Sequence, residues 1–374
     1  MIYLDYSATT PVNALVLDCF NQACKNYLGN PNSLHKLGLE AKHAIDLATS
    51  EMAKILNVKE NELIYTSGAS ESNNLAIKGV AMRYSNRGKH IITSELEHSS
   101  VIAPIAYLQG QGFEVDFVKL DHEGIIDLEH FKTLLRDDTI LVSLASVNSE
   151  IGIVQPINEI GLIIKNYRNC FFHVDMTQSV GKERVELANV DLASFSAQKF
   201  YGLKGIGGLY RRGGVILEPL IHGGKSTTVF RSGTPALPLI VSMAKAMSLA
   251  DQDLEEKYAY VLLLNEYLKE QLVKYPGVVI NSNDKCLPHI LNLSVRGVEP
   301  SLLQHVLEED DIYISTQTAC SMTDTASKAV FALTNDQELA LTSVRISLSY
   351  LTTKEELDQF IESFDKNYHL LTEK

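Results

Sequence analysis

The chain has 374 residues, a formal net charge of −13 at pH 7 and 45% hydrophobic residues. This length predicts two domains, with enough apolar residues to form a core in each. The acidic excess, without a cluster of lysine or arginine, argues against direct nucleic-acid binding. No apolar run approaches the roughly 20 residues that span a bilayer, and the N-terminus lacks the pattern of a signal peptide. We therefore expect no membrane partner.

Five cysteines at irregular spacing argue against a disulfide framework and favour a reducing compartment, which predicts a cytoplasmic protein. One of them, Cys320, lies in a polar stretch without glycine from Ser315 to Ser327, so it is a candidate reactive thiol on a loop. The other four lie in apolar patterns and are expected to be small core residues. These are Cys19, Cys24, Cys170 and Cys286.

Strand-like and helix-like segments alternate between about residues 60 and 215, which is typical of a mostly parallel sheet with helices on both faces. The expected strands carry few charges, as in strands that are covered on both sides. They are Glu62–Thr66, His90–Ser94, Phe113–Lys119, Ile140–Val147, Cys170–Asp175, Asp191–Ser196 and Gly207–Arg211.

The C-terminal third has a different pattern. A single long helical pattern runs from Pro238 to about Tyr275. The last helix is expected to open with a capping box at Thr352–Glu356. The elements expected between them are a strand at His289–Ser294, a helix at Ser301–Glu308 and a strand at Val344–Leu348. These patterns predict an N-terminal arm at 1–14 that joins the small domain, a large domain at 15–240 and a small α+β domain at 241–374.

Two of the expected strands end in residues of complementary chemistry. The segment Phe172–Gln178 carries Asp175, and the segment Ser194–Lys199 ends in Lys199. A lysine amine that binds pyridoxal phosphate covalently and a carboxylate that keeps the pyridine nitrogen protonated are the pair that this cofactor needs. An isolated aspartate and lysine would be interpreted as an ion pair, so the assignment depends on the residues around them.

The segments around this pair resemble the cofactor core of the class V aminotransferase superfamily and, within it, the cysteine desulfurases of the NifS/IscS type. The resemblance extends over essentially the whole chain. Its other segments are Tyr3–Pro11, Gly29–His35, Thr66–Gly79, Glu97–His98, Val147–Gly152, Arg231–Thr234, Ala319–Ser321 and Val344–Leu348. It implies an α/β fold, the pyridoxal-phosphate-dependent transferase fold of type I. A large domain with a mostly parallel seven-stranded sheet is then joined to a smaller α+β C-terminal domain.

The resemblance also assigns roles to particular residues. Lys199 holds the cofactor and moves the α-proton, Asp175 faces the ring nitrogen, and His98 stacks on the ring and exchanges protons. Gln178 and Asn148 lie near the phenolic oxygen. The residues implied to hold the phosphate are Gly68, Ala69, Ser70, Ser196 and Gln198, together with Thr234 from the neighbouring subunit.

Arg345 lies inside a strand-like segment, where a guanidinium needs an acidic partner or a ligand carboxylate. By resemblance, Arg345 and Asn148 orient the carboxylate of L-cysteine. Cys320 matches the cysteine that receives the sulfur, and its spacing from Arg345 suits the long-loop branch of the family.

The resemblance thus implies a homodimeric cysteine desulfurase that depends on pyridoxal 5'-phosphate and binds no metal. It releases L-alanine and leaves a persulfide on Cys320 for an acceptor protein, as in iron–sulfur cluster biosynthesis or tRNA thiolation. Two alternatives stay open: a selenocysteine lyase or another class V enzyme, and a degenerate sulfur-carrier scaffold. The second is motivated by Gln198, where the family usually has histidine, and by the unusual segment Lys225–Phe230.

Overall fold

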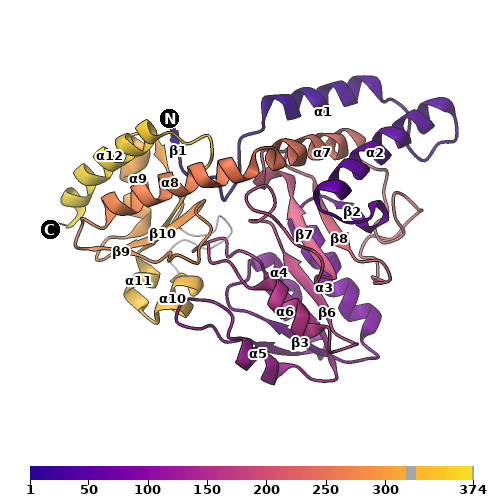
Figure 1. Ribbon diagram of the computed structural model, residues 1–374, viewed down its shortest axis with the longest axis horizontal. Helices are drawn as coiled ribbons and strands as arrows, with labels where there is room; N and C mark the ends of the chain where they lie inside the picture. The colour runs from indigo at the N-terminus through magenta and orange to yellow at the C-terminus, as the bar shows by residue number, and fades with distance from the viewer. Residues whose placement is uncertain (317–325, 373–374) are drawn as a thin grey trace.

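A computed structural model describes residues 1–316 and 326–372, and its largest element is a seven-stranded sheet of order β2-β8-β7-β6-β5-β3-β4 (Figure 1). Strand β8 runs antiparallel to both of its neighbours, and the other pairs are parallel. The strands are β2 (Leu63–Thr66), β3 (His90–Thr93), β4 (Glu114–Phe117), β5 (Thr139–Ala145), β6 (Phe171–Asp175), β7 (Leu192–Ser196) and β8 (Gly207–Arg211). All seven expected strands are present, and the predicted mostly parallel sheet is confirmed.

Helices cover both faces of this sheet, so successive side chains of a strand enter different cores. Leu141 of β5 packs with α3 (Ala69–Tyr84) and α4 (Ser99–Gly110), whereas Val142 belongs to the core on the opposite face. The helices of that second core are α1 (Ala14–Asn26), α2 (Lys36–Ile55), α5 (Leu128–Leu134), α6 (Ile157–Ile164) and α7 (Leu237–Asp251). This coverage explains the near absence of charge in the strand sequences.

The single long helix expected from Pro238 to Tyr275 is wrong, because the structure has two helices there. Helix α7 ends at Asp251, and α8 runs over Leu254–Leu272. Between them Asp253 has a φ of 52°, in the left-handed region, which no α-helix can include. The apolar spacing continues across the break because each helix has its own buried stripe, and a spacing pattern does not report one residue's φ.

The break at Asp253 coincides with a change of hydrophobic core. Residues of α7 up to Ala250 pack with the large sheet, whereas Val261 of α8 belongs to a separate core. The second core is built on a three-stranded antiparallel sheet of order β12-β10-β9. Its elements are β9 (Val278–Ile280), β10 (Ile290–Val295), β12 (Ser343–Ser347), α9 (Pro300–Glu309) and α12 (Lys354–Thr372), with the short helices α10 (Lys328–Thr334) and α11 (Gln337–Leu341) beside them.

The capping box expected before the last helix is present. The backbone N–H of Glu356 donates to Thr353 Oγ1 at 3.1 Å, and the N–H of Thr353 donates to Glu356 Oε2 at 2.9 Å. Two N–H groups at the start of α12 are thereby satisfied by side chains, which defines where the helix begins.

The N-terminal arm packs against the C-terminal part of the chain. Strand β1 (Ile2–Tyr3) pairs in parallel with β11 (Ile312–Tyr313), and the N–H of Ser347 donates to Leu4 O at 2.7 Å. Figure 1 shows the N-terminus beside α12, from where the chain crosses to α1 at the other end of the molecule. We propose that residues 1–14 belong with the small domain, and that the boundary lies near residue 252 rather than 240.

The cysteine expectations are only partly correct. Cys170 is buried, but Cys24 is exposed. It follows Ala23, which lies on the buried stripe of α1, and neighbouring helical residues point about 100° apart. Cys19 and Cys286 are half-buried, and Cys320 lies outside the described residues.

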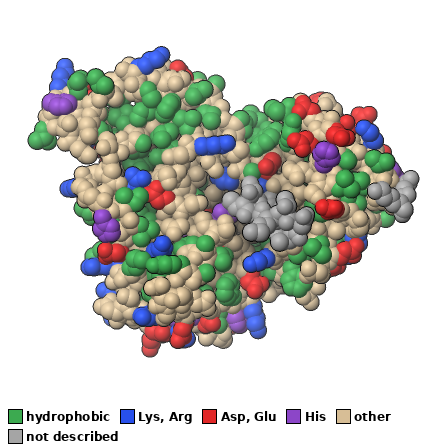
Figure 2. Space-filling view, turned by 180° about the vertical axis from the view of Figure 1, so that it is seen from behind, with side chains coloured by type: hydrophobic (Ala, Val, Ile, Leu, Met, Phe, Trp, Pro, Cys, Tyr) green, Lys and Arg blue, Asp and Glu red, His purple; other side chains and the backbone are tan. Residues whose placement is uncertain are grey.

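Apolar side chains gather at the end of the molecule formed by α1, α2 and α7 (Figure 2). The exposed members on or between α1 and α2 are Leu15, Leu17, Leu28, Leu34, Leu37, Leu39 and Leu47. We call these residues the leucine surface. In the part of the chain that the structure describes, no helix combines the length and the apolar character that crossing a membrane requires.

Candidate active site

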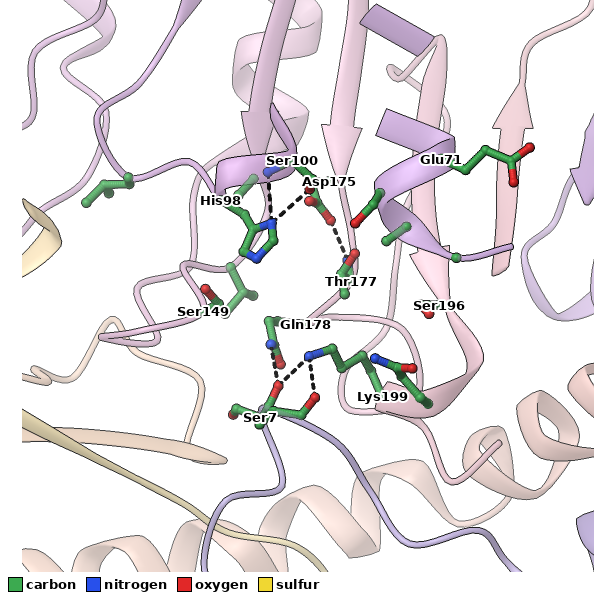
Figure 3. A pocket seen from close by; sticks show the side chains of 18 of the residues that line it. Ser7, Glu71, His98, Ser100, Ser149, Asp175, Thr177, Gln178, Ser196 and Lys199 are labelled. Atoms are coloured by element: carbon green, nitrogen blue, oxygen red, sulfur yellow. Dashed lines mark hydrogen bonds between the residues drawn. The ribbon is translucent and has the colours of Figure 1, made fainter. Parts of the chain in front are cut away.

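A pocket opens at the edge of the large sheet where β6 and β7 end (Figure 3). These strands are parallel neighbours, and Asp175 pairs with Ser194. Asp175 is the last residue of β6, while Lys199 follows β7 in a single 3₁₀ turn, Ala197–Lys199. Both side chains line the same cavity of about 390 Å³. The sheet therefore brings together the acid and the amine that the sequence pattern singles out.

Most residues expected in the site line this pocket. They are Gly68, Ala69, Ser70, His98, Asp175, Gln178, Ser196, Gln198, Lys199 and Arg345. The pocket is also lined by Ser7, Ala8 and Glu71, which the sequence patterns did not single out individually. Ser7 and Ala8 belong to the Tyr3–Pro11 segment. The resemblance therefore singled out this segment, but it did not predict that these two residues line the pocket.

The buried carboxylate of Asp175 is held at both oxygens. Its Oδ1 accepts the backbone N–H of Thr177 at 3.0 Å, and its Oδ2 accepts Asn73 Nδ2 at 2.8 Å. A carboxylate fixed at this position is suited to face the protonated ring nitrogen of the cofactor.

His98 is the N-cap residue of α4. Its Nδ1 accepts the backbone N–H of Ser100 at 3.1 Å and lies 2.8 Å from Ser100 Oγ. Burial lowers the pKa of His98, the charge of Asp175 opposes this effect, and the charge of Lys199 adds to it. The ring therefore lies in the pocket as a neutral imidazole at physiological pH.

The N-terminal arm forms one wall of the site. Lys199 Nζ donates to Ser7 O at 2.6 Å and to Ala8 O at 2.8 Å, and Gln178 Nε2 donates to Ser7 O at 3.1 Å. Gln178 Oε1 accepts a hydrogen bond from Lys182 Nζ at 2.5 Å. Lys182 is buried behind the pocket, and burial, together with the charges of Lys199 and Arg345, lowers its pKa to about 7.

The turn from β2 into α3 forms the end of the pocket suited to an anion. Gly68, at the N-cap of α3, has a φ of 154°, which favours glycine. It is also tightly packed, because a Cβ on Gly207 would lie 2.7 Å from the Gly68 Cα. The unpaired N–H groups and positive dipole end of α3 favour a phosphate here, and Ser70 and Ser196 add hydroxyl donors.

Glu71 lies in the first turn of α3, close to this anion site. An unpaired carboxylate there would repel a phosphate, but Arg231 Nε lies 2.9 Å from Glu71 Oε1. Burial alone would raise the pKa of Glu71, yet the hydrogen bonds from Arg231 and from the N–H of Ser67 hold it below its usual range. The ion pair also joins the Arg231–Thr234 segment to the phosphate end of the pocket.

Arg345 occupies the other end of the pocket. It is buried on β12, with Nη2 at 2.7 Å from Asp5 Oδ1 and Nη1 at 2.8 Å from Ser149 O. The acidic partner that the sequence requires is thus Asp5 of the arm. Arg345 Nε has no hydrogen-bond partner among the described residues, and these two bonds use only two of the five N–H donors of the guanidinium.

Three expected site residues do not line this pocket. The Asn148 amide bonds three backbone groups and thereby shapes the turn that carries Ser149 O toward Arg345. Thr234 is exposed on a loop outside the pocket. Cys320 lies in 317–325, outside the described residues. The contacts expected of these three residues stay predictions.

A mostly parallel sheet whose edge presents a lysine, a buried aspartate and a helix N-terminus is typical of a class of pyridoxal-phosphate enzymes. The family model described as "Aminotransferase class-V" matches residues 2–360, so this chain belongs to the class-V aminotransferase family.

The similarity to individual proteins extends over nearly the whole chain. A protein of Dictyoglomus turgidum named "Cysteine desulfurase IscS" is 40% identical over 98% of this chain and 94% of its own length. A solved "NIFS-LIKE PROTEIN" has a TM-score of 0.93 and 36% identity over 99% of this chain and all of its own. The structure "SspA in complex with cysteine" has a TM-score of 0.83 and 32% identity over 94% of this chain and all of its own.

Enzymes of this family depend on pyridoxal 5'-phosphate, and the pocket residues fit that cofactor. The turn at Gly68 suits its phosphate, Asp175 its ring nitrogen and the Gln178 amide its phenolic oxygen, with Lys199 in the same cavity. Within residues 1–316 and 326–372, no group of three or more metal-ligating side chains could hold a metal ion.

Proposed function

We propose that this chain is a cysteine desulfurase, which converts L-cysteine to L-alanine and keeps the sulfur as a persulfide. The observation that supports this function most strongly is the pocket that unites Lys199, Asp175 and Arg345. A relative named "Cysteine desulfurase IscS" and a structural neighbour whose title includes cysteine support the choice of substrate.

When bound, pyridoxal phosphate supplies an electron sink that draws charge from the substrate's α-carbon. Asp175 keeps the ring nitrogen protonated, and Lys199 holds the cofactor and moves the α-proton of the bound cysteine. Arg345 orients the substrate carboxylate, and Asn148 shapes the turn that carries Ser149 O to the Arg345 guanidinium, which is a contribution of positioning rather than of chemistry. Arg345 lines the pocket, and Asp5 and Ser149 take only two of its five N–H donors, which supports this role.

Cys320 is the proposed nucleophile, on the basis of its place in the sequence. Its thiolate attacks the sulfur of the bound cysteine and forms the S–S bond of a persulfide. The C–S bond would break with its electron pair left on the β-carbon, and protonation of that carbon together with return of the α-proton by Lys199 would complete alanine.

A pair of variants tests these roles. Lys199→Ala is expected to lose both the visible absorbance of the bound cofactor and all cysteine turnover. Cys320→Ala should keep the absorbance but form neither sulfide nor persulfide. Cys24→Ala is the matched control, because this exposed thiol lies on α1 and should be dispensable. Full turnover by Cys320→Ala would rule out the nucleophile, and faster turnover of selenocysteine than of cysteine would favour a selenocysteine lyase.

We also propose that the chain is a homodimer in which Thr234 of one subunit reaches the cofactor phosphate bound by the other. Two features support this dimer. Thr234 is exposed outside its own pocket, and the leucine surface is an exposed apolar surface of the kind that binds another protein. Mixing Lys199→Ala subunits with Thr234→Val subunits should create one intact site in each mixed dimer and restore activity. A monomer by sedimentation would contradict the proposal.

The persulfide sulfur then passes to an acceptor protein in the cytoplasm, for iron–sulfur cluster assembly or tRNA thiolation. A thiol that must stay reduced between turnovers supports a reducing compartment. With radiolabelled cysteine, label should move from the enzyme to another protein of a cell extract, and Cys320→Ala should abolish the transfer. Label that stays on the enzyme would contradict an acceptor.

A further inference from the structure

Two residues with proposed cofactor roles, Asp175 and His98, are linked through two residues that have none so far. Asn73 Nδ2 lies 2.8 Å from Asp175 Oδ2 and 2.8 Å from Ser100 Oγ, and that hydroxyl lies 2.8 Å from His98 Nδ1. Asn73 is fully buried on α3, while Ser100 lies in the first turn of α4. The four side chains form a continuous hydrogen-bonded path behind the cofactor site.

The direction of each bond follows from which groups can donate. The Asn73 atom that faces Asp175 is the amide nitrogen, which can only donate, so Asp175 Oδ2 is the acceptor. The two hydrogens of this nitrogen go to Asp175 and to Ser100 Oγ. The amide oxygen of Asn73 has no partner among the described residues, and a buried acceptor left unpaired is unfavourable. The two bonds of the nitrogen therefore hold the amide in this orientation.

The hydroxyl of Ser100 accepts from Asn73 and so donates its own hydrogen to His98 Nδ1. The backbone N–H of Ser100, which can only donate, points to the same atom at 3.1 Å. With two donors directed at it, Nδ1 carries no hydrogen, and a neutral imidazole must carry it on Nε2. Figure 3 shows Nδ1 of His98 facing Ser100 and the other ring nitrogen directed away from it, into the pocket.

We propose that Asn73 and Ser100 are positioning residues that fix the carboxylate of Asp175 and hold His98 in the tautomer with hydrogen on Nε2. The inference deepens the proposed function and rests on it. His98 then presents a donor to the bound cofactor and substrate, so its proton exchange begins with donation from Nε2. The burial that lowers the pKa of His98 is consistent with a neutral ring.

The tautomer can be measured in the unchanged protein. Nitrogen-15 NMR of the histidine-labelled holoenzyme at pH 7 to 8 should show an unprotonated Nδ1 and a protonated Nε2 for His98, which His98→Gln identifies among the 11 histidines. A protonated Nδ1 would overturn the proposal, and this measurement does not depend on whether any variant folds.

Two variants test the two halves of the path separately: the bond from Asn73 to Asp175 and the bond from Ser100 to His98. Asn73→Leu removes both donors and should weaken cofactor binding about ten-fold or more, because a bond to a charged group is lost. Ser100→Ala should leave cofactor affinity within about two-fold, lower kcat with little change in KM, and shift the His98 nitrogen resonances. Ser100→Thr, which keeps the hydroxyl, should restore both. Ser99→Ala is the matched control, because Ser99 is the exposed neighbour in the same helical turn.

Wild-type cofactor affinity in Asn73→Leu, or unchanged His98 resonances in Ser100→Ala, would contradict the proposal. Cofactor titration and NMR use no cysteine, so they separate this inference from the proposed function. A protein that binds cofactor and shows the expected tautomer but leaves cysteine intact would refute the desulfurase assignment alone.

Discussion

The two ends of the pocket are built in different ways. The phosphate end consists of the turn Gly68–Ser70 and of Ser196, each of which directly follows or ends a strand of the large sheet. The arginine end consists of Asp5, Ser149 and Arg345, and Asp5 and Arg345 are separated by 340 positions in the chain. The first is a product of local sequence, whereas the second exists only when the arm, the large domain and the small domain are assembled.

The two ends also differ in how their polar groups are satisfied. At the phosphate end, the N–H groups at the start of α3 have no helical partner and suit a bound anion. At the arginine end, the protein itself supplies Asp5 Oδ1 and Ser149 O. Substitutions at the phosphate end should therefore change cofactor affinity, and substitutions at the arginine end should change stability.

The largest effect is expected for Asp5→Ala. It leaves a buried guanidinium without its carboxylate, which should lower the free energy of unfolding by about 3–5 kcal/mol. Urea unfolding of the cofactor-free protein measures the loss. Asp5→Asn, which keeps an acceptor, should lose less, and Asp5→Ala with Arg345→Met should recover part of the stability. A loss below about 1 kcal/mol would show that the arginine end does not hold the arm in place.

Lys182 is buried behind the pocket, and replacing it should raise the stability of the protein while weakening cofactor binding. Its pKa falls from 10.5 in the unfolded chain to about 7 when folded, so the unfolded chain binds more protons between these values. Wild-type stability therefore rises with pH from about 7 to 10.5. Lys182→Met should be more stable by about 1 kcal/mol or more at pH 6, and this gain should shrink toward pH 10.

The same variant should bind cofactor less tightly, because Gln178 loses the donor that orients its amide. Unfolding at pH 6 and pH 10 and cofactor titration at pH 8 measure the two effects. Lys165→Met is a control with an exposed amine and should change neither quantity. A gain in stability that does not vary with pH would contradict the assigned titration.

Glu97, a half-buried acid near the sheet edge, provides a second test of this kind. Burial, together with the charge of Asp175, raises its pKa to about 8, from 4.5 when unfolded. The folded protein then holds more protons between these values, so stability falls as pH rises from about 4.5 to 8. Glu97→Gln keeps the acceptor for Ser94 Oγ and Ala145 N–H. It should match the wild type at pH 5 and exceed it by about 1 kcal/mol or more at pH 8 to 9. Equal stability at both pH values would contradict the raised pKa.

The smallest effect is expected for Ser196→Ala at the phosphate end. Loss of one hydroxyl donor should weaken cofactor binding by about 1 kcal/mol, or roughly five-fold. The unfolding free energy of the cofactor-free protein should change by less than about 0.5 kcal/mol. Cofactor titration and urea unfolding of the same preparation measure both. If Ser196→Ala lost more unfolding free energy than cofactor-binding free energy, the phosphate end would affect stability as the arginine end does, and the two ends would not differ.

Much of the fold could be predicted from the sequence because buried parallel strands are short apolar runs with few charges. The seven strands of the large sheet are the clearest case, and the capping box before α12 is another. The break between α7 and α8 could not be predicted, because it depends on the φ of Asp253 and on which of two cores each helix enters. The exposure of Cys24 was missed because an apolar neighbourhood in sequence covers more than one face of a helix.

The glycine turn before α3 and the Asp175–Lys199 pair could be predicted from the sequence alone, because each depends on a strand and on the residues that follow it. The pairing of Asp5 with Arg345, the contact of Lys182 with Gln178 and the path from Asp175 through Asn73 and Ser100 to His98 are visible only in the folded chain. The order of residues shows that a side chain is polar but not which way it points. A hydrogen bond between distant segments forms only where packing of the two cores brings donor and acceptor within about 3 Å.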